Sequence, residues 1–201
     1  MKFYRGSASH AVGYAFSDER LPVDRRAEDY YLAEGADVVE RLTVGADGSV
    51  RRDSLDRGQY GSWVEGNNPL TGEPKGHARC DAERALRFVE VTVNGPKTWT
   101  IAAEIHPDIA EAYEAAQDRA TESLARSFAS KCMTRVGAGG TSQMGLSEVE
   151  VVAIRHYTSR AGDPHRHIHL QLNARVQSAD GRWRSLDSVA FRGMIAEING
   201  L

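Results

Sequence analysis

Within residues 165–176, HRHIHLQLNARV, polar and apolar side chains alternate without a break from His167 to Val176. Successive side chains of an extended strand point to opposite faces, so this pattern predicts a β-strand and excludes an amphipathic helix. One face carries Ile168, Leu170, Leu172, Ala174 and Val176, and the other carries His167, His169, Gln171, Asn173 and Arg175. The second face indicates a polar groove beside a pair of histidines.

Two further stretches predict neighbouring strands. Residues 87–93, RFVEVTV, place three valines on one face of a half-buried strand and Glu90 on the other. Residues 149–157, VEVVAIRHY, predict a strand that runs into His156. The turn-rich residues 36–84 are expected to hold a hairpin or a short helix.

Helices are expected later in the chain. One runs from about Asp108 to Lys131 after Pro107, since proline suits the first turn of a helix. Its apolar stripe consists of Ile109, Tyr113, Ala116, Ala120, Leu124 and Phe128. Residues 182–187 predict a strand and residues 188–201 an amphipathic helix. This order favours an α+β fold, an antiparallel β-sheet with helices packed on one face.

Composition narrows the class of protein. With 201 residues, 41% of them hydrophobic and 26% charged, the chain is expected to form one globular domain. No apolar run approaches a membrane span and the N-terminus lacks an apolar signal segment, which predicts a cytoplasmic protein without membrane insertion. Cys80 and Cys132 form no C-x-x-C motif and are interpreted as reduced structural thiols. A net charge of −3 means that any DNA-binding surface must be local.

The histidines form a candidate metal site. His167 and His169 share a strand face about 7 Å apart, close enough to converge on one ion. His156, at the end of the preceding strand, can supply a third ligand, and three imidazoles leave open positions for a catalytic metal. His165 lies before the alternation and is interpreted as a supporting or solvent-facing residue. The alternative is an ordinary polar strand face without a metal.

The segment HYTSRAGDPHRHIH, residues 156–169, resembles the three-histidine motif of conjugative relaxases of the MobF (TrwC-like) class. These are HUH endonucleases, and the His-hydrophobe-His pair here is His167–Ile168–His169, with His156 at the family's spacing. Residues 87–116 and 176–187 are also similar to family segments. The resemblance implies an HUH endonuclease-like relaxase fold. It also implies one relaxase domain over residues 1–201, as the N-terminal part of a longer protein.

The resemblance also implies a tyrosine nucleophile near the N-terminus. Tyr14, in VGYAF, resembles the first tyrosine position, and Tyr30 and Tyr31, in EDYYLAEG, resemble a second pair. Tyr14 is favoured as the first nucleophile, whereas packing of a helix is the alternative for the pair. Glu90 stands where the family usually has an aspartate, and its implied role is to hydrogen-bond near the histidines and help set their protonation. The alternative is a surface glutamate.

The implied reaction is metal-dependent nicking of one DNA strand. A phenol, with a pKa of about 10, must lose its proton before it attacks phosphorus and forms a 5′-phosphotyrosine link. That link keeps the bond energy, so the strand can be rejoined. The cofactor is a divalent cation, with Mg²⁺ or Mn²⁺ expected in use and Zn²⁺ or Ni²⁺ possible in a crystal. Such an enzyme, a DNA relaxase, initiates conjugative transfer of a plasmid or element.

The expected partner is single-stranded or supercoiled DNA at a transfer origin, with accessory relaxosome and coupling proteins. The stretch from Arg155 to Arg192 contains seven arginines and only three aspartates, which predicts a local positive patch. Trp183 can stack on an unpaired base or fill a strand core. The candidate DNA contacts are Lys97, Arg160, Arg175, Arg182, Trp183 and Arg184.

Three other functions remain open from the sequence. A rolling-circle replication initiator of the same superfamily shares the chemistry and differs in its DNA target. A metal-dependent hydrolase of small molecules uses three histidines but does not need the tyrosines. A non-catalytic single-stranded-DNA-binding relic is suggested by Glu90 and the single Tyr14, whereas retention of three histidines argues against it.

Overall fold

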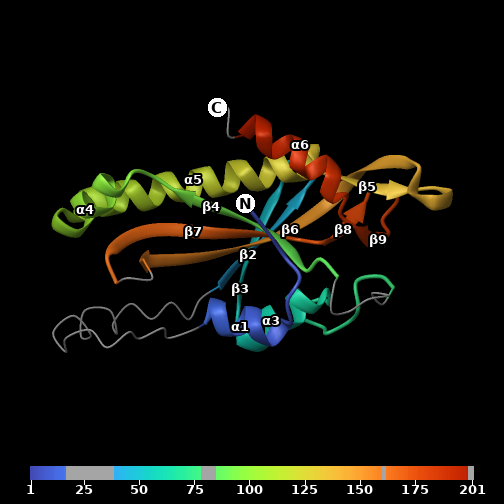
Figure 1. Cartoon of the computed structure of the whole chain (residues 1–201), viewed down its shortest axis with the longest axis horizontal. Helices are drawn as coiled ribbons and strands as arrows, with labels where there is room; N and C mark the ends of the chain where they lie inside the picture. The colour runs from blue at the N-terminus through green and yellow to red at the C-terminus, as the bar shows by residue number, and fades with distance from the viewer. Residues whose placement is uncertain (17–38, 78–84, 160–161, 199–201) are drawn as a thin grey trace.

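The computed structural model describes residues 1–16, 39–77, 85–159 and 162–198 (Figure 1). The elements are β1 (Lys2–Tyr4), α1 (Ala8–Ala15), β2 (Val39–Gly45), β3 (Val50–Leu55), α3 (Arg57–Glu65), β4 (Phe88–Asn94), α4 (Lys97–Ile105), α5 (Pro107–Lys131), β5 (Met133–Val136), a 3₁₀ turn (Ala138–Gly140), β6 (Ser142–Thr158), β7 (Pro164–Asn173), β8 (Arg175–Ser178), β9 (Trp183–Ser185) and α6 (Ser188–Ile198). Among the described helices, none is long and apolar enough to cross a membrane.

The strands form one antiparallel sheet in the order β1-β4-β7-β6-β2-β3. The long strand β6 also pairs with β5 and β8 near its start, and β9 pairs with β8. The three strands predicted over residues 87–93, 149–157 and 165–176 correspond to β4, β6 and β7, which lie side by side at the centre. The predicted α+β class with an antiparallel sheet is therefore confirmed.

Helices cover both faces of the sheet, so the expectation of one covered face was wrong. Figure 1 shows α4, α5 and α6 on one side and α1 and α3 on the other. The cause lies in β6, where Val151 and Ala153 enter one buried cluster while Val152 and Ile154 enter a second. A continuous apolar run of this kind is typical of a strand buried on both faces.

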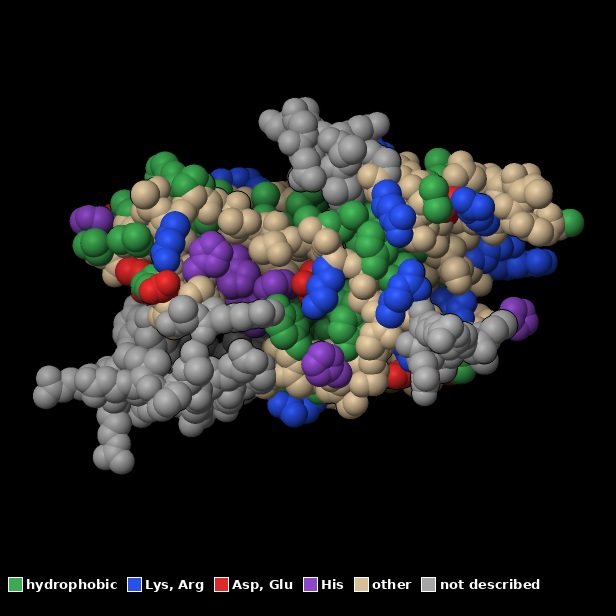
Figure 2. Space-filling model, viewed as in Figure 1, with side chains coloured by type: hydrophobic (Ala, Val, Ile, Leu, Met, Phe, Trp, Pro, Cys, Tyr) green, Lys and Arg blue, Asp and Glu red, His purple; other side chains and the backbone are tan. Residues whose placement is uncertain are grey.

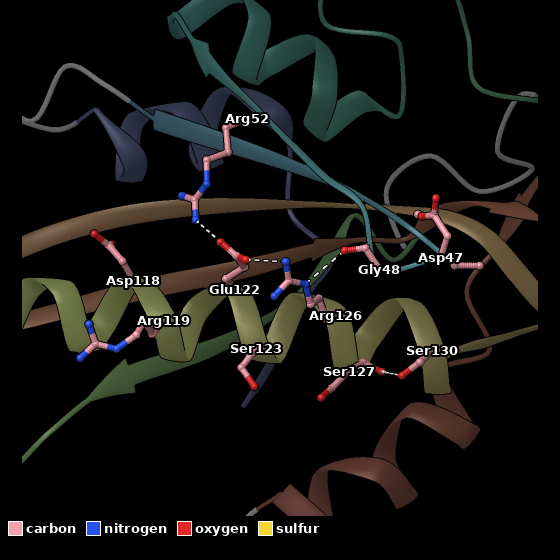
Figure 3. Close-up of a pocket in the computed structure, with 12 residues that line it drawn as sticks. Asp47, Gly48, Arg52, Asp118, Arg119, Glu122, Ser123, Arg126, Ser127 and Ser130 are labelled. Carbon is pink, nitrogen blue, oxygen red and sulfur yellow. Dashed lines mark hydrogen bonds and ion pairs between the residues drawn. The ribbon is translucent and has the colours of Figure 1, made fainter.

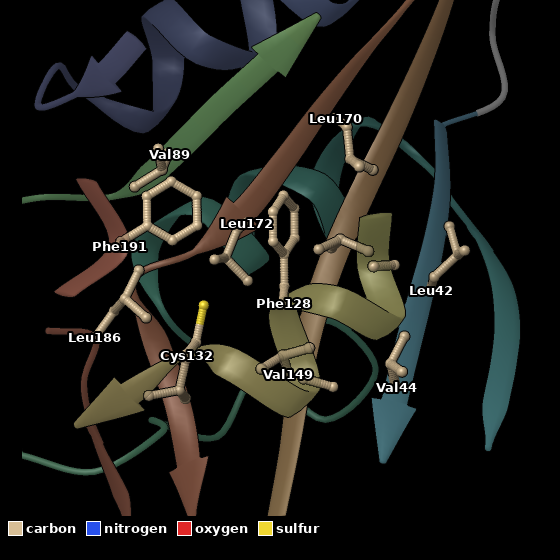
Figure 4. Packing of buried hydrophobic residues seen from close by; sticks show 14 of the residues in the cluster. Leu42, Val44, Val89, Phe128, Cys132, Val149, Leu170, Leu172, Leu186 and Phe191 are labelled. Carbon is tan, nitrogen blue, oxygen red and sulfur yellow. The ribbon is translucent and has the colours of Figure 1, made fainter. Parts of the chain in front are cut away.

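The larger cluster packs the sheet against α5 and α6. Figure 4 shows Phe128 of α5 and Phe191 of α6 beside Val89, Leu170 and Leu172 of the sheet. Phe128 and Phe191 have ring centres 5.4 Å apart. Burying a side chain of this size contributes about 1.5–3 kcal/mol, so this layer is a main source of stability.

The predicted strand over residues 165–176 is divided at Ala174 into β7 and β8. The Asn173 side chain accepts a hydrogen bond from the Arg175 amide at 2.8 Å, which supports the chain at this break. Alternation survives the break, because Val176 still enters the larger cluster. The predicted groove was wrong, since Gln171 and Asn173 are fully buried beneath α3 and its neighbours.

Helix α5 begins at Pro107 and ends at Lys131, as predicted. Its buried stripe agrees with the prediction at Phe128 but is shifted by one residue earlier in the helix, so that Gln117 and Thr121 are buried whereas Ala116 and Ala120 are exposed. The Gln117 amide is buried because it donates to the Arg166 carbonyl at 3.1 Å. Glutamine is usually a surface residue, so hydrophobicity alone does not predict that this position is buried.

Candidate active site

The three histidines lie together on the central strands. In the β6–β7 register His156 is directly opposite His167, and His169 is two residues further along β7 on the same face. The ring centres are 5.3 Å apart for His156 and His167, 5.1 Å for His156 and His169, and 4.9 Å for His167 and His169. Figure 2 shows a group of histidine side chains on this face of the molecule.

The Nε2 atoms of His167 and His169 are 3.1 Å apart. Two imidazole nitrogens bound to one cation at about 2.1 Å lie about 3.0–3.4 Å apart, so the pair already has the spacing of two ligands. His167 Nδ1 lies 2.7 Å from the His165 carbonyl oxygen, which can only accept a hydrogen bond. The proton of His167 therefore belongs on Nδ1, and its Nε2 lone pair faces His169.

Glu90 fixes the other side of His169. Its Oε1 lies 3.2 Å from His169 Nδ1, within ion-pair distance, although the N–H is not aligned for a full hydrogen bond. Burial alone would raise the pKa of Glu90, but the contacts with His169 and Gln171 outweigh it and lower the pKa below its ordinary value. An ionised carboxylate favours the proton of His169 on Nδ1, which leaves the Nε2 lone pair toward His167.

His156 completes the group. Burial first, and the neighbouring His169 and His167 second, lower its pKa from 6.5 to about 4, so the ring is neutral at pH 7. Its Nε2 is buried and has no hydrogen-bond partner among the described residues. A neutral imidazole with an orphaned nitrogen is in the form that binds a metal.

The residues present fit a divalent cation. Three imidazoles bound through Nε2 to one ion have ring centres about 4.5–5.3 Å apart, given bonds of about 2.1 Å, and the observed triangle matches. In the described part of the chain, however, no group of three His, Cys, Asp or Glu side chains is already closed around one point. The imidazoles of His167 and His169 therefore already have the spacing of two ligands, and the imidazole of His156 lies beside them.

Tyr14 reaches the same point from α1. Its hydroxyl is 3.1 Å from His169 Nε2, and its ring contacts His169 edge-on at 5.5 Å between centres. Helix α1 is held in place by its N-cap, where the Ser7 side chain accepts a hydrogen bond from the His10 amide. Tyr30 and Tyr31 lie outside the described residues.

Lys2 belongs to this group and was missed from the sequence. Strand β1 places it directly opposite Glu90 in β4, and its Nζ lies 5.8 Å from the centre of the Tyr14 ring and 5.9 Å from that of Tyr4. Its side chain is exposed. A lysine near a terminus carries no local signal, because only the β1–β4 pairing brings it to the site.

Two buried side chains behind Glu90 were also missed. Gln171, on the polar face of β7, donates through Nε2 to Glu90 Oε2 at 2.9 Å. Tyr60 of α3 donates its hydroxyl to Gln171 Oε1 at 2.7 Å. Alternation indicated which way Gln171 points, whereas nothing local indicated that Tyr60 contacts it.

The predicted DNA contacts divide into exposed and internal residues. Arg182 is exposed, and Lys97 is exposed beside Asp163, 3.1 Å away. Arg175 is buried and its guanidinium donates to the His77 carbonyl. Trp183 is half-buried, with Lys75 Nζ 5.1 Å from its ring centre. Arg184 is paired with Asp180, and Arg160 lies outside the described residues.

Among the described arginines of the expected positive patch, Arg155, Arg166 and Arg184 are paired with carboxylates. Arg166 is buried between Glu104 of α4, at 3.1 Å, and Glu114 of α5. Arg155 pairs with Asp118 of α5. The linear count of charges therefore overstates the positive charge at Arg155 and Arg166, because carboxylates from α4 and α5 meet these two arginines in space.

A separate hollow of about 640 Å³ lies between α5 and the β2–β3 turn (Figure 3). Glu122 there lies 2.7 Å from both Arg52 and Arg126, so the charges pair with one another. None of the histidines or described tyrosines lines this hollow. We therefore assign the chemistry to the histidine site.

Comparison with solved structures defines the class as a relaxase fold. The metal-bound structure of conjugative relaxase TrwC in complex with OriT DNA superimposes with a TM-score of 0.67 at 22% identity, over 95% of this chain and 61% of that one. The copper-bound complex gives 0.65 at 21%, over 92% and 60%. The metal-free complex gives 0.61 at 24%, over 84% and 58%. This chain thus spans about 60% of the length of these relatives.

The chain belongs to the TrwC relaxase family, whose model matches residues 8–198. The predicted family and fold are therefore confirmed. No curated protein matches the sequence.

Proposed function

We propose that this protein is a metal-dependent DNA relaxase that nicks and rejoins one strand at a transfer origin, through a covalent link to Tyr14. The observation that carries the proposal is the Tyr14 hydroxyl, 3.1 Å from His169 Nε2, which itself lies 3.1 Å from His167 Nε2. A nucleophile and a pair of metal-ligating lone pairs thus meet at one point. Membership of the TrwC relaxase family supports the same reaction.

In the proposed reaction, the Tyr14 phenolate oxygen attacks the scissile phosphorus. The new bond from phosphorus to the tyrosine oxygen forms as the bond to the 3′ oxygen breaks, and that oxygen takes up a proton to become a free 3′-hydroxyl. Rejoining is the reverse, in which a 3′-hydroxyl displaces the tyrosine. His156, His167 and His169 would hold a divalent cation, which when bound stabilises charge on the phosphate oxygens.

Glu90 has a supporting role in this proposal. Its carboxylate keeps the proton of His169 on Nδ1, so that Nε2 stays available as a ligand. The pKa of Glu90 is lowered, which keeps this carboxylate ionised at neutral pH. A base that removes the phenol proton is not assigned to it.

The ion is proposed to be Mg²⁺ or Mn²⁺ in use. Metal-bound and copper-bound structures of TrwC support a divalent cation in the family. Imidazoles bind Cu²⁺, Ni²⁺ and Zn²⁺ more tightly than Mn²⁺, so a metal found in a crystal need not be the one that works in the cell.

The proposed partner is single-stranded or supercoiled DNA at a transfer origin, with accessory relaxosome and coupling proteins. One related TrwC structure contains OriT DNA, and another contains a 27-mer DNA that comprises the recognition hairpin and the cleavage site. Lys2, Lys97 and Arg182 are exposed cations, and a phosphate would compete with Asp163 for Lys97 and with Asp180 for Arg182. A plasmid substrate would place the reaction in the cytoplasm, and one continuous sheet supports a single relaxase domain over residues 1–201.

The test is covalent trapping of labelled single-stranded oligonucleotides from candidate transfer origins, with Mn²⁺ or Mg²⁺, on a denaturing gel. We expect a protein-linked 5′ product that disappears in Tyr14→Phe and in His167→Ala but persists in Tyr30→Phe and Tyr31→Phe. Loss in Tyr30→Phe or Tyr31→Phe alone would move the nucleophile to that residue. Metal binding without an adduct on any single strand would overturn the relaxase proposal. Adducts confined to replication origins would indicate a rolling-circle initiator.

A further inference from the structure

Behind the histidine site, a line of hydrogen bonds runs into the protein interior. It starts at the Tyr60 hydroxyl in α3, passes through the Gln171 amide in β7 and reaches the Glu90 carboxylate in β4. Glu90 then faces His169, which in turn contacts Tyr14. Tyr60 and Gln171 are both fully buried and Glu90 is 7% exposed, so water does not compete for these bonds.

The direction of each bond follows from the groups involved. A carboxylate only accepts hydrogen bonds, so the NH₂ group of Gln171 must face Glu90 Oε2, 2.9 Å away. The amide oxygen of Gln171 then faces Tyr60, whose hydroxyl donates to it at 2.7 Å. If the amide were flipped, its oxygen would face the carboxylate oxygen, and these two acceptors would repel each other. Tyr60 therefore selects the orientation of Gln171 that suits Glu90.

The backbone holds both ends of this line. Glu90 and Gln171 are directly opposite each other in the β4–β7 register, so their side chains share one face of the sheet. Tyr60 is fixed within α3 by its stacking on Trp63, with ring centres 5.8 Å apart, and by the N-cap at Asp56. The line therefore connects a packed helix to the site through side chains that have little freedom to move.

We propose that Tyr60 and Gln171 are positioning residues of the histidine site, because they hold Glu90 Oε2 in place. Glu90 Oε1 then faces His169 Nδ1. As a result, the Nε2 lone pair of His169 faces His167 and Tyr14. A glutamate side chain has three rotatable bonds, and Gln171 removes this freedom for Glu90. Without Gln171, the carboxylate can turn toward Lys2, which lies directly opposite Glu90 in the β1–β4 pairing. The inference rests on the proposed function for its purpose, but its geometry does not involve DNA.

The experiment reads the tautomer of His169 directly. Long-range ¹H–¹⁵N correlation spectra of the metal-free, ¹⁵N-labelled protein at pH 8 distinguish a proton on Nδ1 from one on Nε2, and a His169→Gln spectrum assigns the signals. We expect the proton on Nδ1 in the parent protein and a mixture of both forms in Gln171→Met. Tyr60→Phe, a milder change that keeps the packing, should shift the mixture in the same direction by less.

A second readout is metal affinity. Titration with Mn²⁺ or Co²⁺ should give about tenfold weaker binding in Gln171→Met, which is the usual cost of losing a group that orients a ligand. The matched control is Asn173→Leu, two residues along the same face, where a buried amide donates to the Trp63 carbonyl and not to Glu90. It should lower the free energy of unfolding but keep the parent's tautomer and metal affinity.

The outcomes separate this inference from the proposed reaction. A parent-like tautomer in both Gln171→Met and Tyr60→Phe would overturn it, as would an equal change in Asn173→Leu. If Gln171→Met does not fold, Tyr60→Phe alone decides the question. A shifted tautomer in a protein that never nicks DNA would leave the positioning role standing and remove the relaxase reaction.

Discussion

At the scale of single residues, the sequence predicts what depends on local geometry. Alternation along β7 was sufficient to place His167 and His169 on one face, and that face is where Tyr14 arrives. Lys2 and Tyr60 could not be found this way, because their contacts depend on which strands and helices pack together. The histidine motif therefore predicts the candidate metal ligands of the site, but not the residues that only tertiary packing brings to it.

The first prediction concerns Lys2. Lys2→Met removes a cation that lies 5.8 Å from the Tyr14 ring, so we expect weaker binding of a single-stranded oligonucleotide. One lost phosphate contact should also reduce the slope of log affinity against log salt by about 0.7. Fluorescence anisotropy at several salt concentrations measures both. Lys131→Met, the same change at the end of α5, is the control, and an unchanged slope in Lys2→Met would contradict a phosphate contact.

The second prediction concerns pH and His156. Its pKa is about 4 in the folded protein and 6.5 in the unfolded chain, so between these values the unfolded chain binds the additional proton. The stability of the metal-free protein should therefore fall as pH decreases from about 6.5 to 4, by on the order of 2 kcal/mol. Urea unfolding in EDTA measures the change. His156→Gln should flatten this part of the pH profile, and an equally steep profile would rule out His156 as its source.

At the scale of elements, long regular patterns were predicted and short interrupted ones were not. Helix α5 was predicted from its proline start and its period, whereas α4 was missed. The nine residues of α4 include Thr98, Thr100 and two isoleucines, which are weak helix formers. Tertiary contacts hold α4 in place, such as the Thr100 hydroxyl that accepts a hydrogen bond from the Arg166 amide.

The third prediction is made for α3. Asp56 and Gln59 form a capping box, in which the Asp56 side chain accepts from the Gln59 amide at 2.8 Å and the Gln59 side chain accepts from the Asp56 amide at 2.9 Å. Asp56→Ala should lower the free energy of unfolding by about 1 kcal/mol. Thermal or urea denaturation tests this value. Glu73→Ala removes an exposed carboxylate outside any helix and serves for comparison, and equal losses would mean that the cap has no special role.

At the scale of the whole molecule, the main feature that the sequence did not predict is that both faces of the sheet are buried. Patterns along one strand show which residues are apolar but not how many layers cover them. The described residues form two clusters, one on each face, and Cys132 lies inside the larger one. That cysteine is unpaired, in agreement with a reduced thiol, whereas Cys80 lies outside the described residues.

The fourth prediction uses Cys132 to report on the whole fold. Burial raises its pKa to about 12, so almost none of the thiol is ionised at pH 8. In a Cys80→Ser background, alkylation by iodoacetamide should be slow and should follow global unfolding as urea is added. Mass spectrometry over time gives the rate. Rapid labelling without urea would show that this layer opens locally.

The polar face of β7 passes from partly exposed imidazoles at His167 and His169 to fully buried amides at Gln171 and Asn173 within seven residues. Mutational tolerance should change along the same short distance. At the histidine end, substitutions should abolish the proposed activity and leave a folded protein, which would supply inactive variants for trapping a complex. At the amide end, most substitutions should remove activity and abundance together, so a survey of variants in cells would separate the two ends of one strand by expression level alone.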